Sequence, residues 1–320
     1  MQFAVPPRKS PHPLPGARSS RLPLYRRKQL KTIGLFAFAL LVILYLLTHL
    51  SSSSSSSIVT PAGTAGPVVI VTLLDREHWS ESYINKIIAN REDYAKRHDY
   101  TNFFATYSEY DEAVGDAPKS WATIPAVRHA MATHTHAAYF FHLSPHALFM
   151  NPSKPLKSHI LERNQLESIM LKDVPVVPPD SIIRTFAHLR EKDVDFITTQ
   201  DSEDLTPGSF VLKNGDFARY LLDLWFEPLF RNYNFQKAEI HGLDHIIQWH
   251  PTVLARTALV PQRALNAYSK DSRGAGPDGT YQDGDFLIRF PGCDDMEGKE
   301  CAELEPYYMI WQKKLKSIRS

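Results

Sequence analysis

The sequence has few cysteines, no usable glycosylation sequon and no acidic residue in its first fifty positions. Its two cysteines, Cys293 and Cys301, lie close together near the C-terminus. The one Asn-x-Ser candidate, Asn151-Pro152-Ser153, has proline in the middle, which excludes an N-glycan there. The formal charge is +1 for the whole chain and +8 for the first fifty residues, so the rest carries −7. That balance gives no support to nucleic-acid binding.

Two acids are also lacking where a metal site would need them. The apolar run 137–143 predicts a buried strand, and ligands collect at strand ends in α/β sheets. A divalent cation that bridges a diphosphate prefers hard oxygen ligands, normally two acids one residue apart. Those two places hold Ser144 and His146. The frame of a metal and nucleotide site is therefore present without its carboxylates.

Residues 33–50 are almost wholly apolar and long enough for one transmembrane helix. Residues 1–32 are basic, and positive flanks stay in the cytosol, so we expect a cytoplasmic tail and a lumenal remainder. A cleaved signal peptide is the alternative, with small residues near position 62 as the cleavage site, although secretory leaders are usually shorter. The pattern favours a type II signal anchor.

Residues 51–66 are expected to form a Ser-rich stem, and residues 67–320 one large α/β unit or two closely joined lobes. Strands are predicted at 68–74, 103–106, 137–143, 195–199, 209–212 and 286–290, and helices at 81–97, 125–133, 217–230 and 243–249. This alternation predicts a mostly parallel central sheet covered on both faces. The proline-rich residues 161–179 predict a long loop, either a cover for the site or a plain insertion.

Seven blocks of sequence follow one another between residues 67 and 310: VVIVTLLD, INKIIANREDYAKRHDY, KSWATIPAVRHAM, HALFMNPSKPL, GSFVLKNGDFARYLLDLWFEP, VPQRALNAYSK and YQDGDFLIRFPGC. Together they resemble the fungal Golgi α-1,6-mannosyltransferase subunits of the galactosyl/mannosyltransferase group, glycosyltransferase family 34. The resemblance implies a GT-A nucleotide-diphospho-sugar fold, retaining transfer from a sugar nucleotide, and a divalent metal, usually Mn²⁺.

Carried over residue by residue, the resemblance is mixed. The strand end keeps the family's frame at Leu143, Ala147, Met150, Asn151 and Pro152. Ser144 and His146 replace the two acids of the family's motif. Near the C-terminus, Arg289 takes the place of a histidine that contacts metal or diphosphate in the family. Asp244 keeps the chemistry of an acidic helix start.

These replacements leave two interpretations open. His146 can bind Mn²⁺ as a neutral imidazole, but a hydroxyl and an imidazole supply far less charge than two carboxylates. Arg289 can instead neutralise a diphosphate directly, which describes a metal-independent transferase. The other interpretation is weakened or lost catalysis, with the donor pocket retained as structure.

Other candidate residues each have a structural alternative. Asp75, after the first strand, is a candidate contact to a nucleotide base or ribose, or else a helix N-cap or loop acid. The resemblance implies donor-side contacts for Asn90 and Arg91, which a packed helix surface would equally explain. Arg128 is a candidate phosphate partner, or it pairs with a nearby carboxylate.

Histidines, tryptophans and cysteines are the last candidate functional residues. His129, His134, His136, His142 and His146 crowd together, but without a nearby cysteine, solvated or core histidines are favoured over a zinc site, with His146 as the exception because it occupies the motif. Trp121, Trp225 and Trp249 are core residues or sugar-stacking platforms. Cys293 and Cys301 form a disulfide in an oxidising lumen, or remain reduced and buried.

Asp244 is the candidate catalytic residue, an acid that stabilises oxocarbenium-like charge at the anomeric carbon or attacks it; a cap of helix 243–249 is the alternative. The resemblance implies a Golgi membrane protein that transfers mannose from GDP-mannose to the α-1,6-mannan backbone of N-glycans. Its expected partners are other mannosyltransferase subunits of one complex. A non-catalytic subunit of that mannan polymerase complex and a galactosyltransferase are the alternatives.

Overall fold

The computed structural model describes residues 68–178, 181–271, 276–294, 296 and 298–319. The tail, apolar segment and stem predicted for residues 1–66 lie outside these residues. Within the described ranges, no helix combines the length and the hydropathy that crossing a bilayer requires.

A six-stranded sheet forms the centre of the described chain. Its order is β2 (Thr101–Thr106), β1 (Val68–Leu74), β3 (Tyr139–Leu143), β6 (Ser209–Lys213), β5 (Phe196–Thr198) and β7 (Thr257–Leu259). The pairs β1–β2, β1–β3 and β5–β7 are parallel, whereas β6 is antiparallel to both of its neighbours. The prediction of a mostly parallel α/β sheet is confirmed, with β6 as the exception.

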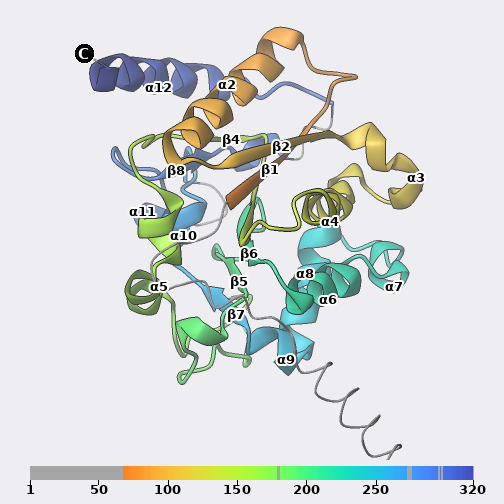
Figure 1. Ribbon diagram of the computed structural model, residues 1–320. Helices are drawn as coiled ribbons and strands as arrows, with labels where there is room; N and C mark the ends of the chain where they lie inside the picture. Colours follow the sequence, from red (N-terminus) through yellow and green to blue (C-terminus); the bar gives the residue numbers. More distant parts are fainter. Residues whose placement is uncertain (1–67, 179–180, 272–275, 295, 297, 320) are drawn as a thin grey trace, which may run out of the picture. The chain divides into compact units, whose positions relative to one another are not determined.

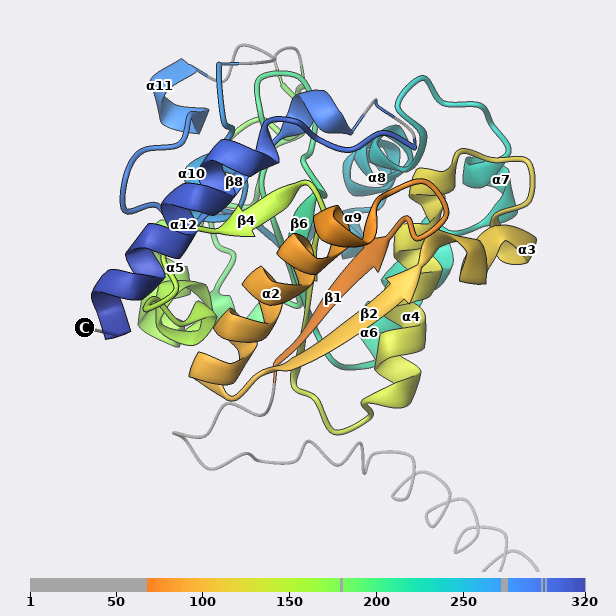
Figure 2. The same cartoon turned by 90° about the horizontal axis from the view of Figure 1, so that it is seen from above.

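Helices cover the sheet on both faces (Figures 1 and 2). The longer ones are α2 (Glu81–His98), α4 (Thr123–Thr133), α6 (Asp216–Trp225), α8 (Ala238–Trp249) and α12 (Leu304–Arg319). Val69, Val71 and Leu73 of β1 share a core with α4, α6 and α8. Val68 and Ile70 point to the opposite face, where they share a core with α2 and β4. All of β1 is therefore buried, as expected for a strand that is covered on both sides.

A smaller antiparallel sheet joins β4 (Ala147–Phe149) to β8 (Leu287–Arg289). Leu148 of β4 and Ile288 of β8 pack with residues of α2 and α12 in a third core. In this sheet Ala147 is the register partner of Arg289. The pairing brings a residue near the C-terminus to the segment that follows β3.

Short elements connect these parts. They are η1 (Tyr107–Tyr110), α3 (Asp111–Val114), η2 (Lys119–Ala122), the π-helical turn η3 (Lys157–Leu161), α5 (Arg163–Ile169), η4 (Glu191–Asp193), α7 (Pro228–Arg231), α9 (Pro251–Leu254), α10 (Gln262–Leu265), α11 (Gly276–Gly279) and η5 (Pro291–Cys293).

Three predicted elements differ from the structure. The helix predicted at 217–230 ends at Trp225, and α7 begins at Pro228, because proline is accommodated only in the first turn of a helix. The helix predicted to begin at residue 243 begins at Ala238, so Asp244 lies in its middle and does not cap it. The loop predicted at 161–179 contains α5.

Candidate functional site

A cleft lies at the sheet edge formed by the carboxyl ends of β1, β2 and β3 and by the start of β6. Two adjoining depressions compose it, and both are lined by Tyr107, Ser120, His146 and Asp294. Their empty volumes of about 630 and 680 Å³ include space open to solvent. This is the edge where α/β sheets bind ligands.

Another depression, of about 590 Å³, lies at the opposite edge, where β6 ends at Lys213. Several charged groups there already have partners. Arg163 Nε lies 2.5 Å from Glu191 Oε1, and Arg256 pairs with Asp195. We therefore place the functional site in the cleft at the carboxyl edge.

Arg289 is the buried cation of the cleft, whereas Lys119 lines only its outer depression. Arg289 is the last residue of β8 and is only 4% exposed. Its Nη2 donates to Asp294 Oδ2 at 2.6 Å, whereas Nε and Nη1 have no hydrogen-bond partner. Buried N–H groups without partners are unfavourable, so these two free donors favour an anionic ligand in the cleft.

Gly208 makes room for that guanidinium. It directly precedes β6, and its carbonyl accepts a hydrogen bond of 2.7 Å from the Ser144 N–H. A Cβ at position 208 would lie 2.0 Å from Arg289 Cζ and 2.1 Å from Nε. Any side chain at this position would therefore require the guanidinium to move.

Replacing Gly208 by alanine is expected to displace Arg289, to weaken anion binding in the cleft and to lower the free energy of unfolding by about 1–3 kcal/mol, as overpacking does. Chemical denaturation and calorimetry measure the two effects. Gly215→Ala is the matched control, because no atom lies within 4 Å of a Cβ added there. A Gly208→Ala variant with unchanged stability and unchanged affinity would contradict this role.

Ser144 and His146 lie at the end of β3, and both line the cleft. Ser144 Oγ accepts a hydrogen bond of 3.1 Å from the His146 N–H. The His146 ring packs edge-on against Trp79, with ring centroids 5.4 Å apart. Burial, with the neighbouring Arg289, lowers the pKa of His146, although Asp294 opposes the shift. The imidazole is therefore neutral at neutral pH, and its Nδ1 has no partner.

Asp75 follows β1 and lines the outer depression. Its Oδ1 accepts hydrogen bonds from the N–H groups of Glu77 at 3.2 Å and His78 at 3.1 Å. The His78 Nδ1 lies 2.8 Å from the same oxygen. This carboxylate closes the turn after β1 as a loop acid, and Ser80 is the N-cap of α2.

Glu239, which the sequence reasoning missed, lines the cleft from the first turn of α8. Its Oε2 accepts a hydrogen bond from Ser120 Oγ. Burial raises the pKa of Glu239 to about 7; Asp294 adds to the shift and Arg289 opposes it. The carboxyl group therefore changes charge near neutral pH inside the cleft. The helix was predicted to begin at residue 243, five residues after its observed start at Ala238, so this acid lay outside the predicted helix.

Asp244, the predicted catalytic acid, is not among the residues that line the cleft. Its Oδ1 accepts a hydrogen bond of 3.1 Å from the Leu205 N–H, Oδ2 has no partner, and burial raises its pKa to about 8. Ligand atoms of Asp204, His241 and Asp244 lie within 4.8 Å of one another. Lys237 already pairs with Asp204, and we assign no metal to this group.

Asn90 and Arg91, the predicted donor-side contacts, lie fully buried beneath the cleft. Asn90 donates to the Phe149 carbonyl at 3.1 Å and accepts from the Phe149 N–H at 2.9 Å. Arg91 Nη2 donates to the Ser144 carbonyl at 2.8 Å. Both residues thus hold the backbone that follows β3.

Arg128 does not line the cleft, because it lies on the surface of α4, where its Nε is 3.1 Å from Asp223 Oδ1. Trp121 and Trp225 are buried, at 1% and 0% exposure. Trp249 is 69% exposed. The core alternative therefore describes two of the three tryptophans.

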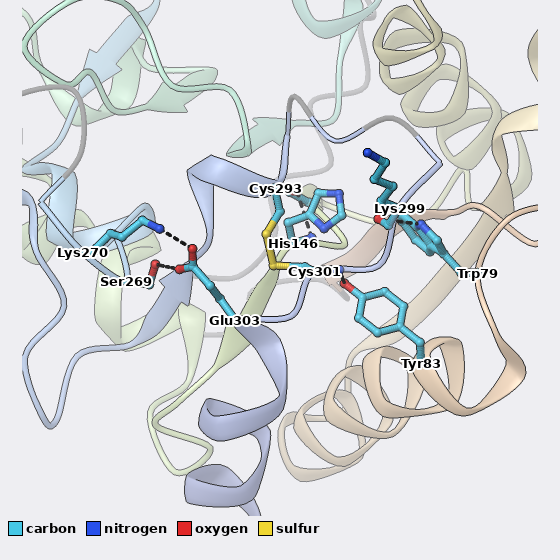
Figure 3. Close-up of a disulfide and its surroundings, with 10 residues drawn as sticks. Trp79, Tyr83, His146, Ser269, Lys270, Cys293, Lys299, Cys301 and Glu303 are labelled. Atoms are coloured by element: carbon cyan, nitrogen blue, oxygen red, sulfur yellow. Dashed lines mark hydrogen bonds and ion pairs between the residues drawn. A yellow bond between two sulfur atoms is a disulfide. The ribbon is translucent and has the colours of Figure 1, made fainter.

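A disulfide joins Cys293 to Cys301 beside the cleft. Figure 3 shows His146, Trp79 and Tyr83 around it. The Cys301 N–H donates to Tyr83 Oη at 3.2 Å, and Trp79 Nε1 donates to the carbonyl of Lys299 at 3.1 Å. The 293–301 segment, which carries Asp294, is thereby fastened to α2 and to the turn before it.

A mixed α/β sheet with a cleft at its carboxyl edge, lined by a buried arginine, is an arrangement in which proteins of the α/β class bind ligands. The galactosyl transferase GMA12/MNN10 family matches residues 64–301, and the chain belongs to this family. The expected resemblance to the galactosyl/mannosyltransferase group is confirmed.

Relatives in this family are named either galactosyltransferases or mannosyltransferases. The chain is 35% identical over 215 residues to an uncharacterized alpha-1,2-galactosyltransferase of Schizosaccharomyces pombe, a match that covers 66% of this chain and 56% of the relative. It is 30% identical over 247 residues to the probable alpha-1,6-mannosyltransferase MNN11 of Saccharomyces cerevisiae, covering 72% and 58%. The chain thus spans little more than half the length of these two relatives.

A solved structure with a similar chain course is a glycosyltransferase involved in the glycosylation of the major capsid of PBCV-1. The TM-score is 0.47 at 12% sequence identity, covering 72% of this chain and 96% of the other.

Proposed function

We propose that the chain is a hexosyltransferase of the GT-A type that takes its sugar from a nucleoside diphosphate donor. One observation carries the proposal: Arg289, with two free donors, and Glu239, with a titratable carboxyl, line the same cleft. A cationic donor suits the diphosphate, and a carboxylate suits the sugar carbon that becomes positively charged during transfer.

In this proposal the ionised Glu239 stabilises oxocarbenium-like charge at the anomeric carbon. Asp244 was predicted for this role from the sequence. It lies on the same helix but outside the cleft lining, with one oxygen bound to the Leu205 N–H. We therefore assign the role to Glu239.

The donor proposed from the sequence blocks is GDP-mannose, used in α-1,6-mannan backbone elongation of N-glycans. A galactosyl donor such as UDP-galactose is the competing choice, because the relative at 35% identity is named a galactosyltransferase. The cleft residues described above recognise a diphosphate and an anomeric carbon, which both donors share.

The proposed setting is the Golgi membrane, with type II orientation, a lumenal catalytic domain and other mannosyltransferase subunits as partners. Residues 33–50 support the anchor through their apolar composition. The basic leader before them supports the orientation.

A non-catalytic subunit of a mannan polymerase complex is the second candidate function. It is favoured by the strand end after β3, where Ser144 and His146 provide no carboxylate. In that case the cleft would have no donor to activate, and the domain would act by binding its partners.

A transfer assay separates the two functions. The purified 320-residue chain is incubated with GDP-mannose or UDP-galactose and a mannoside acceptor, and released nucleoside diphosphate and extended acceptor are measured. We expect transfer from one donor and little from the other. A folded chain that transfers from neither, and that releases no nucleotide even with partner subunits added, would contradict the proposal and favour the non-catalytic role.

A further inference from the structure

The metal ion implied by the family resemblance does not fit the residues of this cleft. Asp294 is bound to Arg289, and Asp75 closes the turn after β1. Glu239 accepts from Ser120, and the cleft residues with a free ring nitrogen are two neutral histidines, His142 and His146, which supply no negative charge. The three metal-type side chains that do meet within the described residues belong to the Asp204 group outside the cleft lining.

A fixed positive charge is already built into the cleft. The Arg289 side chain is 4% exposed, and its one acidic partner, Asp294, keeps 21% of its side chain exposed. The guanidinium lies in space that only a glycine at position 208 leaves open. It would repel a divalent cation placed beside it.

The two guanidinium nitrogens without hydrogen-bond partners indicate which kind of ligand Arg289 would bind. Nε and Nη1 are buried and have no partner, while Nη2 is held by Asp294. Two N–H groups on separate nitrogens can each donate to a phosphate oxygen, and a charged donor makes these bonds strong. A diphosphate offers both the oxygens and the charge that a metal would otherwise neutralise.

We infer that Arg289 takes the place of the divalent cation, so that this chain binds the diphosphate of its donor without a metal. The inference rests on the proposed function and deepens it. Asp294 orients the guanidinium, Gly208 leaves space for it, and His146 beside it stays neutral.

The test is calorimetric titration of GDP and of UDP into the purified 320-residue chain, first with EDTA and then with excess MnCl₂. We expect one nucleotide to bind with the same affinity in both conditions. Arg289→Ala is expected to weaken that binding roughly 10- to 150-fold, the effect of losing hydrogen bonds from a charged group. Arg289→Lys, which keeps the charge and loses the planar fork, should bind with intermediate affinity.

Arg219→Ala is the matched control, because Arg219 pairs with Asp216 on the exposed surface of α6. Its affinity should equal that of the unmodified chain. Thermal unfolding of every variant establishes that it is folded. The comparison of EDTA with MnCl₂ uses the unmodified chain, so it tests metal dependence even if a variant fails to fold.

Three other results are informative, and each would overturn a different part of the account. Binding that requires Mn²⁺ would overturn the metal-free inference and leave the proposed function standing. Metal-free binding that is unchanged in Arg289→Ala would overturn the role of Arg289. No nucleotide binding in either condition, by a chain that unfolds cooperatively, would overturn the proposed function and the inference with it.

Discussion

Glu239→Gln is expected to lower the transfer rate roughly 100- to 1,000-fold, the loss seen when one electrostatic group at a reacting centre is removed. The amide keeps the shape of the carboxyl and can still accept the hydrogen bond from Ser120. It cannot become negative, so it does not stabilise charge on the sugar. Donor affinity should change little, because Arg289 holds the diphosphate. Steady-state kinetics with the preferred donor measure kcat and KM separately.

The pH profile provides a second readout for the same residue. Burial raises the pKa of Glu239 to about 7, so its carboxylate forms as the pH rises through about 7, and transfer should rise over the same interval. This rising limb should be absent from the residual activity of Glu239→Gln. Because the raised pKa makes ionisation unfavourable in the fold, the variant should be at least as stable as the unmodified chain at pH 8.

Asp244→Asn decides between the two acids of α8. With a pKa of about 8, Asp244 is largely protonated at neutral pH, and an asparagine oxygen can still accept from the Leu205 N–H. We expect this variant to retain transfer. Loss of transfer in Asp244→Asn, together with full activity in Glu239→Gln, would return the catalytic role to the residue predicted from the sequence.

Replacing both cysteines by serine is expected to lower the free energy of unfolding by about 2.5 kcal/mol, the loop-closure contribution of a short disulfide loop. Cys293 and Cys301 are eight positions apart, and Asp294 lies directly inside the loop. A looser loop would hold Asp294, and through it Arg289, less firmly. Nucleotide affinity should therefore fall along with stability, and urea denaturation and calorimetry measure the two.

A reducing agent supplies the control for this variant. Reduction should destabilise the unmodified chain by a similar amount and leave the double serine variant unaffected. Equal stability of the oxidised chain, the reduced chain and the serine variant would contradict a structural role for the disulfide.

The elements predicted well from the sequence are those with a strong local pattern. A continuous β-rich run of seven residues, apolar except for Thr72, predicts β1, and the apolar spacing of 81–97 predicts α2 to within one residue. The start of α8 was missed because Gly242 and polar neighbours interrupt its pattern. The glycine at position 242 is explained by a long-range contact, because a Cβ there would lie 2.9 Å from the Trp121 ring. A close approach between distant segments is not visible in a local pattern.

Only part of the candidate site could be predicted, because its other residues meet through contacts between distant segments. The motif positions of Ser144, His146 and Arg289 follow from the family resemblance, and all three line the cleft. Two features of the site could not be predicted: Gly208 makes room for Arg289, and Glu239 lines the same cleft. Both depend on contacts between parts of the chain about 30 to 80 positions apart. Asn90 and Arg91 support the cleft from beneath through buried hydrogen bonds to backbone, a role that resemblance alone does not distinguish from ligand contact.

The most direct test of the account is an experimental structure of the chain with GDP or UDP bound. The account predicts the diphosphate in the cleft at the carboxyl ends of β1 and β3, with a phosphate oxygen within about 3 Å of Arg289 Nε or Nη1. Glu239 should then face the position of the transferred sugar. A nucleotide bound elsewhere on the chain, with no phosphate oxygen near Arg289, would contradict it.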